Sequence, residues 1–299
     1  MQFPSWRWCL IVLGLGLAQV PFALAQALVG GVFEHVVRPG ESLTLIGARH
    51  GVDPRLLARE NGLDWQGILR PGQRLRVDNR HLVPEPRSSG IVINIPQRLL
   101  FLFREGRLVA HYPVGLGRPD WPTPVGRFRV REKAVDKTWI VPPSIQAEMA
   151  AKGHEVRERV PPGPDNPLGR HWMGLAPGNW GIHSTIAPAS VYHFQSHGCI
   201  RLHPDDAADL FERIAVGEPV EILYQPLLLA QATDGTVYLE VHRDAYNRGV
   251  DYAQELKTAM ARLGITLDPA VTAPLMARRD GVARALVPTP LPKEADDAP

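Results

Sequence analysis

The 299-residue chain has only two cysteines, Cys9 and Cys199, and the first lies in an apolar stretch at the N-terminus. If that stretch is a removable export signal, the mature protein keeps a single thiol and cannot form an internal disulfide. A lone thiol in an oxidising compartment is a liability unless its reactivity is used. The shortage of cysteine therefore excludes a disulfide framework and makes nucleophilic chemistry at Cys199 the first hypothesis.

The chain also lacks a marked excess of positive or negative charge, and it lacks long apolar runs. Lys and Arg number 33 against 31 Asp and Glu, which gives a net charge of +2, and no basic patch is interleaved with aromatic residues. This pattern argues against a nucleic-acid partner. Beyond the N-terminus, no segment reaches the about 20 consecutive apolar residues that span a bilayer. The composition, 44% hydrophobic and 21% charged, predicts an ordinary globular protein.

Residues 1–25 have the three parts of a secretory signal peptide. Arg7 supplies a basic start without acidic residues, residues 9–18 are apolar, and Ala23 and Ala25 form an A-x-A cleavage site. The apolar centre is too short for a bilayer span. We therefore predict a signal peptide over residues 1–25 and no stable transmembrane anchor, with a retained anchor as the alternative.

Residues 33–78 have the pattern of a strand, two short helices and a second strand. Ser42 can cap the first helix, and Gly51 can end it in a left-handed conformation. Asp53 precedes Pro54, a residue favoured in the first turn of a helix. The pattern predicts a small βααβ domain.

This segment closely resembles a LysM module, a small fold that binds polymers containing N-acetylglucosamine, such as peptidoglycan. The matching positions are Val37, Gly40, Leu43, Ile46, Gly51, Val52, Leu57, Asn61, Leu69, Pro71, Gly72, Gln73, Leu75 and Val77. The resemblance implies a glycan-binding groove that includes Trp65, whose ring can stack on a sugar face. A partly buried tryptophan with a packing role is the alternative for Trp65.

The rest of the chain divides by composition. Residues 79–89 hold two prolines and a Ser-Ser-Gly run, which predicts a linker. Residues 90–225 are rich in β-branched, alternating segments and predict a mainly β domain. Residues 226–270 contain a strand and a helix that predict an extension packed on this domain. Residues 271–299, rich in proline and acid at their end, predict a disordered tail.

Cys199 lies in a Ser-His-Gly-Cys-Ile-Arg run. A free thiol has a pKa of about 8.5, so it needs a neighbouring base or cation at neutral pH. His197 shares a face with Cys199 in an extended chain, and His183 can lie against it if the intervening loop returns. The amides of Gly198 and Cys199 can face a developing oxyanion, and Arg201 can hold a substrate carboxylate.

These residues resemble the catalytic motifs of the L,D-transpeptidases, the YkuD or ErfK family of cell-wall enzymes, over roughly residues 90–223. The matching positions are Thr123, Pro124, Gly126, residues 162–169, Ile182, His183 and residues 196–201. The resemblance implies that Cys199 is the nucleophile and His183 the general base and acid. Ser184 would orient the His183 ring, while His197 and Gly198 would shape the site.

The resemblance also suggests the substrate contacts. Arg201 and Ser196 are predicted to bind substrate. Tyr192 stands where many members have glycine, so it predicts a bulkier approach to the cysteine and a further substrate contact. The implied fold class is α+β, mainly β: a small βααβ LysM domain followed by a β-sandwich-like catalytic domain with a helix at residues 204–213.

The implied reaction is acyl transfer through a thioester. Cys199 would attack the diaminopimelate carbonyl of a tetrapeptide stem, release D-alanine and pass the acyl group to an amine. The acceptor would be a second stem or a lysine of an outer-membrane lipoprotein. The resemblance implies no metal or organic cofactor, peptidoglycan as the partner and the periplasm of a Gram-negative cell as the location.

Several alternatives stay open. The same fold could hydrolyse stem peptides as an L,D-carboxypeptidase or endopeptidase, or the protein could bind peptidoglycan without catalysis. Cys199 could instead be a small buried hydrophobic residue. A zinc site is a further alternative. Its candidate ligands are His183, His193, His197, Cys199 and His203.

Overall fold

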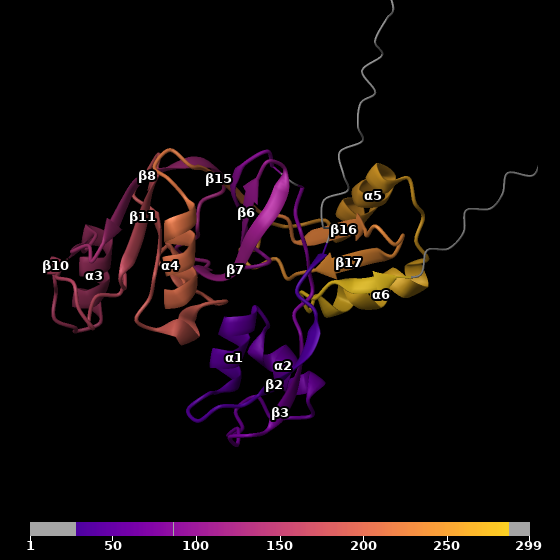
Figure 1. Cartoon of the computed structure of the whole chain (residues 1–299), viewed down its shortest axis with the longest axis horizontal. Coiled ribbons are helices and arrows are strands. Elements are labelled where there is room, and N and C mark those ends of the chain that lie inside the picture. Colours follow the sequence, from indigo (N-terminus) through magenta and orange to yellow (C-terminus); the bar gives the residue numbers. More distant parts are fainter. Residues whose placement is uncertain (1–27, 86, 287–299) are drawn as a thin grey trace, which may run out of the picture.

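The computed structural model describes residues 28–85 and 87–286. They form three parts, and the central part is a large β-sheet (Figure 1). The predicted signal peptide and the last residues of the predicted tail, 287–299, lie outside this range. None of the helices within it has both the length and the apolar character needed to cross a membrane.

The first part has the predicted βααβ order. Its elements are β2 (Val32–Val36), α1 (Leu43–His50), α2 (Pro54–Glu60) and β3 (Arg74–Asp78). The Ser42 hydroxyl accepts from the Leu45 amide, Asp53 caps α2, and Gly51 ends α1 at φ 70°. Strands β2 and β3 pair antiparallel and, with the helices, enclose a small apolar core.

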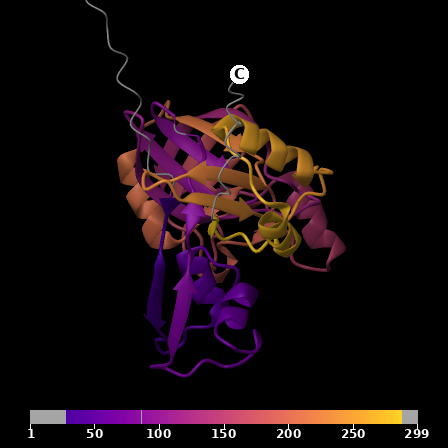
Figure 2. The same cartoon turned by 90° about the vertical axis from the view of Figure 1, so that its right-hand side faces the viewer.

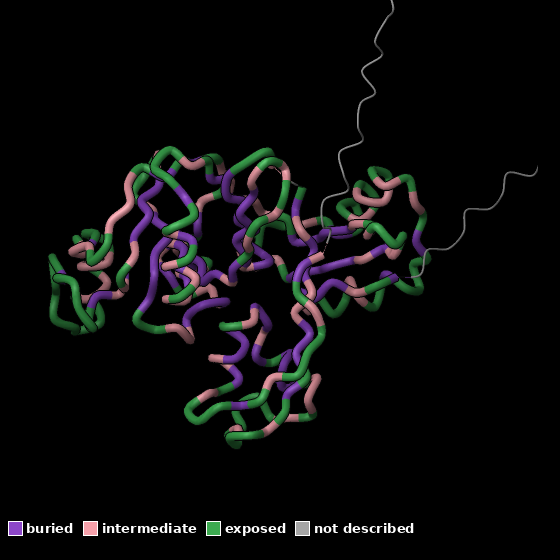
Figure 3. The backbone as a smooth tube through the Cα atoms, in the orientation of Figure 1, coloured by how far each residue is buried: buried purple, intermediate pink, exposed green. Residues whose placement is uncertain are grey.

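The central part is a nine-stranded sheet within the described residues. Its strands are β5 (Gly90–Asn94), β6 (Leu99–Arg104), β7 (Arg107–Gly117), β8 (Gly126–Val135), β11 (His171–Ala176), β12 (Gly181–His183), β13 (Phe194–Ser196), β14 (Ile200–Leu202) and β15 (Pro219–Leu223). Their order is β13-β7-β14-β12-β11-β8-β15-β5-β6, and β6 also pairs with β7. This last pairing closes the sheet on itself, so that its inner face forms the main core (Figure 3). The mainly β, α+β fold class is confirmed.

Helical and loop segments cover this sheet. Helix α4 (Pro204–Arg213) follows β14 and buries Ala207 and Leu210 against the core. A smaller unit, formed by β9 (Trp139–Ile140), α3 (Pro143–Ala151) and β10 (Arg159–Val160), extends from one end of the sheet in Figure 1. A short 3₁₀ turn, η1 (Pro188–Ser190), precedes β13 and contacts the first part through α1.

The third part is a small sheet with two helices, which lies to the right of the central sheet in Figure 1 and in front of it in Figure 2. Its elements are β16 (Leu227–Gln231), β17 (Val237–Val241), α5 (Tyr252–Leu263), α6 (Pro269–Arg278) and β18 (Arg284–Leu286). The prediction of disorder from residue 271 is therefore wrong up to Leu286. Asp268 caps α6, Pro269 fits its first turn, and β18 pairs with β17.

The predicted linker is also more structured than its composition indicates. Within residues 79–89, β4 (His81–Leu82) is buried and pairs with β1 (Leu28–Val29). The His81 ring bonds to the Glu240 carboxylate on β17, 2.8 Å away, and to the Gly51 carbonyl oxygen. The sequence does not indicate this strand because its stabilising partners are distant in the chain.

Candidate active site

The register between β12 and β14 brings the predicted catalytic residues to one place. These strands are parallel, with Ile182 opposite Ile200 and His183 opposite Arg201. Since side chains alternate along a strand, the two isoleucines enter the core while His183 and Arg201 lie on the other face. Cys199 immediately precedes β14 and is half-buried. By this alternation, the thiol, the imidazole and the guanidinium share one face of the sheet.

The orientation of His183 suits a general base. Its Nδ1–H donates to the backbone carbonyl oxygen of Ser184 at 2.5 Å, which leaves Nε2 as the basic nitrogen. Ser184 thus holds the ring through its main chain. Burial, and then the positive charge of Arg201, lower the pKa of His183 to about 4. The imidazole is therefore neutral at pH 7 and able to accept a proton.

The thiol is also uncharged before the reaction. Burial raises the pKa of Cys199, and contacts with the Gly181 backbone and the charge of Arg201 lower it by less. Within the described residues, no hydrogen bond joins the thiol to His183. If this thiol and this imidazole react together, both are neutral beforehand, and proton transfer has to accompany nucleophilic attack.

A tight turn presents the cysteine. The Ser196 hydroxyl donates to the Cys199 carbonyl oxygen at 2.5 Å and accepts from the Gly198 amide at 3.2 Å. Ser196 is buried, so the predicted substrate contact is replaced by a role in holding the turn. Gly198 has φ 98°, and a Cβ there would lie 3.1 Å from Nε1 of Trp180. Glycine is required for both reasons.

Only one of the two predicted oxyanion donors remains available. The Gly198 amide is used by Ser196, whereas the Cys199 amide has no partner among the described residues. The Thr123 hydroxyl donates to the Gly198 carbonyl oxygen at 3.0 Å. Because the C=O and N–H of a trans peptide point in opposite directions, this bond fixes where the Cys199 amide points.

Thr123 is itself held by a residue that the sequence analysis did not identify. The Tyr246 hydroxyl donates to the Gly117 carbonyl oxygen at 2.8 Å and accepts from the Thr123 amide at 3.1 Å. The Gly117 amide donates to the Thr123 hydroxyl at 2.9 Å. Thr123 belongs to a matching motif, but Tyr246 lies after β17, and nothing in its local sequence indicates a role at the site.

Two further predicted residues flank the thiol. The Nε atom of Arg201 is buried and has no hydrogen-bond partner in the described part of the chain, so it is available to a substrate group. His197 turns toward α3, where its Nε2 pairs with the Glu148 carboxylate. Its ring also meets the Trp121 ring edge to face, with centroids 4.5 Å apart. His197 therefore forms a wall of the site.

Tyr192 does not lie at the site. Its ring is buried in a separate apolar cluster, and the Arg98 guanidinium lies 3.9 Å from its centre. The backbone of Tyr192 adopts φ 62°, which turns the side chain into this cluster. The prediction that it contacts substrate is wrong. Trp65, by contrast, is 44% exposed on the first part and lies 4.8 Å from the Arg55 guanidinium.

The zinc alternative fails on geometry. In the described residues, the group of possible ligand atoms that converges is His81, Glu240 and His242. It contains none of the histidines proposed for a site with Cys199.

Comparisons with known proteins identify both the first and the central part of the chain. The family model for the L,D-transpeptidase catalytic domain matches residues 88–222, and the LysM domain model matches residues 35–78. The probable L,D-transpeptidase YcfS of Escherichia coli strain K12 is 34% identical over 223 residues, covering 72% of this chain and 69% of its own length. The chain belongs to the L,D-transpeptidase family.

Other family members are more distant. The probable L,D-transpeptidase ErfK/SrfK of Escherichia coli strain K12 is 30% identical over 237 residues, covering 74% of this chain and 76% of its own length. Among solved structures, an L,D-transpeptidase from Mycobacterium smegmatis is similar at a TM-score of 0.37 and 22% identity, covering 66% of this chain and 94% of that one. On the family models and these sequence relatives, the protein is an enzyme of the L,D-transpeptidase family with an N-terminal LysM domain.

Proposed function

We propose that this L,D-transpeptidase is an exported cysteine acyltransferase that acts on peptidoglycan stem peptides. The observation that carries the proposal is the β12–β14 register, which sets Arg201 opposite His183, with Cys199 two residues before Arg201, immediately before the start of the same strand. The bond from Nδ1 of His183 to the Ser184 carbonyl leaves Nε2 available as the base. The LysM domain would hold the enzyme on the glycan while the catalytic domain acts on the attached peptides.

In the first half-reaction, the Cys199 sulfur attacks the diaminopimelate carbonyl of a tetrapeptide stem as Nε2 of His183 takes the thiol proton. The Cys199 amide donates to the oxyanion. When the tetrahedral intermediate collapses, the carbon–nitrogen bond breaks and the His183 imidazolium protonates the leaving amine of D-alanine. A thioester remains on Cys199.

In the second half-reaction, an acceptor amine attacks the thioester carbonyl. Nε2 of His183 takes a proton from the amine and returns it to the departing Cys199 sulfur, which restores the thiol and the neutral imidazole. Arg201, with its unpartnered Nε, would bind a carboxylate of the stem and fix the donor peptide.

The acceptor would be a second stem peptide, which gives a 3→3 cross-link, or a lysine of an outer-membrane lipoprotein in the periplasm of a Gram-negative cell. Hydrolysis by water on the same thioester is the second candidate. The same thiol and imidazole would serve this reaction, and nothing in residues 196–201 distinguishes an amine from water as the attacking group.

Mass spectrometry of muropeptides tests the proposal. Residues 26–299 and the Cys199→Ala variant are incubated separately with a disaccharide-tetrapeptide. Cross-linked dimers from the unmodified chain alone would support transfer between stems. Tripeptide and D-alanine without dimers would favour hydrolysis; if adding a lipoprotein peptide then yields an adduct, lipoprotein attachment is supported instead. Identical products from both proteins would contradict a tetrapeptide donor.

A further inference from the structure

A second site lies where the three parts of the enzyme meet. A cavity of about 430 Å³ is lined by α2 and Trp65 of the LysM domain, by His193 and Phe194 next to β13, and by the segments after β17 and α6. Because β13 ends at Ser196, the cavity is connected through one short strand to the turn that presents Cys199.

The cavity has a strong excess of positive charge in a chain whose net charge is only +2. Its charged lining residues, apart from histidine, are Arg55, Arg59, Arg98, Arg243, Arg278, Arg279, Asp53 and Asp280. Of these arginines, only Arg278 forms an ion pair with a described carboxylate, that of Asp280 at 2.9 Å. The Nε atom of Arg98 is buried and has no hydrogen-bond partner in residues 28–85 and 87–286.

Water screens the repulsion among these arginines because most of their heads are exposed. The guanidinium groups of Arg55, Arg98 and Arg279 lie over aromatic rings. Those of Arg59 and Arg243 are on exposed residues and have no hydrogen bond or ion pair among the described residues, so they can exchange water for an anion. Several positively charged groups around a concave surface raise the local electrostatic potential, which attracts negatively charged ligands.

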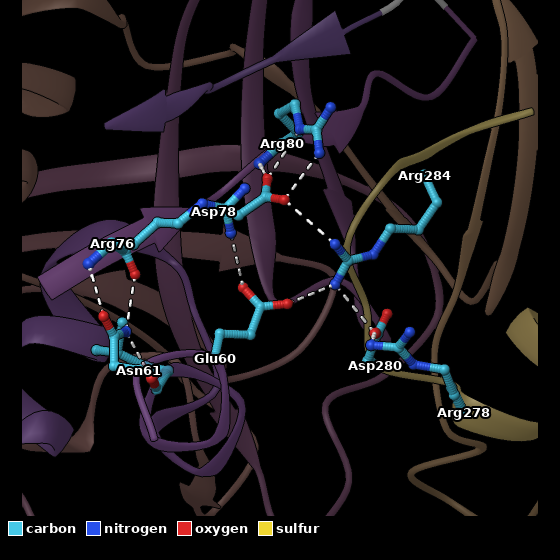
Figure 4. A network of polar contacts seen from close by, with 9 residues as sticks. Glu60, Asn61, Arg76, Asp78, Arg80, Arg278, Asp280 and Arg284 are labelled. Atoms are coloured by element: carbon cyan, nitrogen blue, oxygen red, sulfur yellow. Dashed lines mark hydrogen bonds and ion pairs between the residues drawn. The ribbon is translucent and has the colours of Figure 1, made fainter. Parts of the chain in front are cut away.

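The walls of the cavity are fixed by ion pairs between the LysM domain and the C-terminal part (Figure 4). The Arg284 guanidinium contacts Glu60 at 2.8 Å, Asp280 at 3.1 Å and Asp78 at 3.3 Å. Asp280 in turn pairs with Arg278. These pairs join α2 and β3 to the segment that follows α6, so the arginines from both sides are held facing one space.

The chemistry of the lining selects the ligand class. Guanidinium groups bind carboxylates in a planar, two-point geometry, and an exposed indole suits a sugar face. We propose that this cavity binds the carboxylate-bearing stem peptide of a glycan strand whose sugars lie on the LysM domain near Trp65. The proposal rests on the proposed function, and it assigns the C-terminal part a role in substrate binding.

Calorimetric titration tests this assignment. The Cys199→Ala form of residues 26–299 prevents turnover, and it is titrated with a disaccharide-tetrapeptide and with the same disaccharide lacking its peptide. Adding Arg59→Gln and Arg243→Gln is expected to weaken binding of the peptide-bearing ligand about tenfold, since the ligand carboxylates lose two charged donors whose exposed heads are screened by water. Affinity for the peptide-free disaccharide should not change.

Arg107→Gln is the matched control, because Arg107 is exposed on the β6–β7 hairpin, away from the cavity, and forms no ion pair with a described carboxylate. An equal loss in this control would contradict the proposal, as would unchanged affinity in the double variant. Inorganic phosphate that competes as strongly as the tetrapeptide ligand would show a general anion site and also overturn it.

The result of this binding titration can be distinguished from the result of the muropeptide assay that tests the proposed function. If the cysteine-containing chain produces no thioester chemistry but the binding difference holds, the reaction is wrong and the binding site stands. If turnover occurs and the double variant keeps its affinity and KM, the reaction stands and the cavity does not bind the stem.

Discussion

At the scale of single residues, burial rather than ion pairing sets the charge state of the proposed catalytic pair, Cys199 and His183. Buried surroundings disfavour charge on both groups, so they lower the pKa of His183 and raise that of Cys199. A thiolate–imidazolium pair would react with any electrophile that reaches the site. The neutral pair becomes nucleophilic only when a carbonyl is positioned for concerted proton transfer.

This tuning predicts the acid limb of the pH profile. Nε2 of His183 must be unprotonated to accept the thiol proton, and this form predominates above a pKa of about 4. We expect kcat/KM for the tetrapeptide donor to remain near its neutral value as the pH falls from 7 to about 5, and then to decline toward pH 4. Steady-state release of D-alanine measures this, and an inflection near the ordinary histidine pKa of about 6.5 would contradict it.

The location of the candidate site was largely predictable because it depends on short sequence motifs. Cys199, His183 and Arg201 could be assigned from residue type and spacing, and the structure places them on one face. Tyr192 could not. Its side-chain direction depends on a positive φ and on the pocket beneath Arg98, neither of which the sequence shows.

At the scale of elements, the turn before β14 is held from outside the catalytic sheet. Thr123 bonds to the Gly198 carbonyl, and Tyr246 bonds to Thr123 and Gly117. The chain after β17 thus determines the position of the peptide unit that carries the Cys199 amide. The family match ends at residue 222, so this support comes from beyond the matched catalytic domain.

Tyr246→Phe tests this support. The variant removes the hydroxyl and leaves the Gly117 carbonyl and the Thr123 amide without their partner, at a cost of about 1–3 kcal/mol. We expect kcat to fall about tenfold while KM changes little, because the loss affects the oxyanion rather than ground-state binding. Steady-state kinetics with the tetrapeptide donor provides both values.

A purely structural role predicts a different result. Thr123→Val removes the bond to Gly198 directly, so combining it with Tyr246→Phe should add little to the loss of kcat if the two act through one path. Additive losses, or a lower melting temperature with unchanged kcat, would show that Tyr246 stabilises the fold without positioning the turn.

Elements were predictable where their signals are local. The caps at Ser42 and Asp53 and the αL glycine at Gly51 depend on a few neighbouring residues, and all three are confirmed. β4 was missed because its stability depends on contacts with residues more than 150 positions away, on β17. Helix α6 was missed because Pro274 lies inside it, and an internal proline ordinarily argues against a helix.

At the scale of the whole molecule, one buried carboxylate connects the three parts. Glu240 on β17 accepts hydrogen bonds from His81 in β4, from His242 and from Gln97 next to β6. His81 also bonds to the Gly51 carbonyl of the LysM domain. The two nitrogens of the His81 ring thus contact acceptors on both sides, the Glu240 carboxylate on β17 and the Gly51 carbonyl of the LysM domain.

Glu240→Gln removes the negative charge of this buried carboxylate. Burial by itself raises the pKa of Glu240, but the His81 charge and the His242 hydrogen bond outweigh it and lower the pKa to about 2. Breaking a buried pair by neutralising one partner costs about 3–5 kcal/mol. We expect the free energy of unfolding to fall by about 3 kcal/mol, measured by urea denaturation at pH 7, and trypsin to cut more readily between the LysM and catalytic domains.

The pH dependence distinguishes this charge from simple packing. Since the carboxyl pKa is depressed on folding, its contribution is complete above the unfolded value of about 4.3 and is lost as the pH falls toward about 2. The difference in stability between the unmodified chain and Glu240→Gln should therefore shrink below pH 4. Glu255→Gln, an exposed change in the first turn of α5, should lower the free energy of unfolding by less than about 1 kcal/mol. A difference that stays constant down to pH 2.5 would mean that Glu240 acts through its shape, and that the three parts are joined by packing alone.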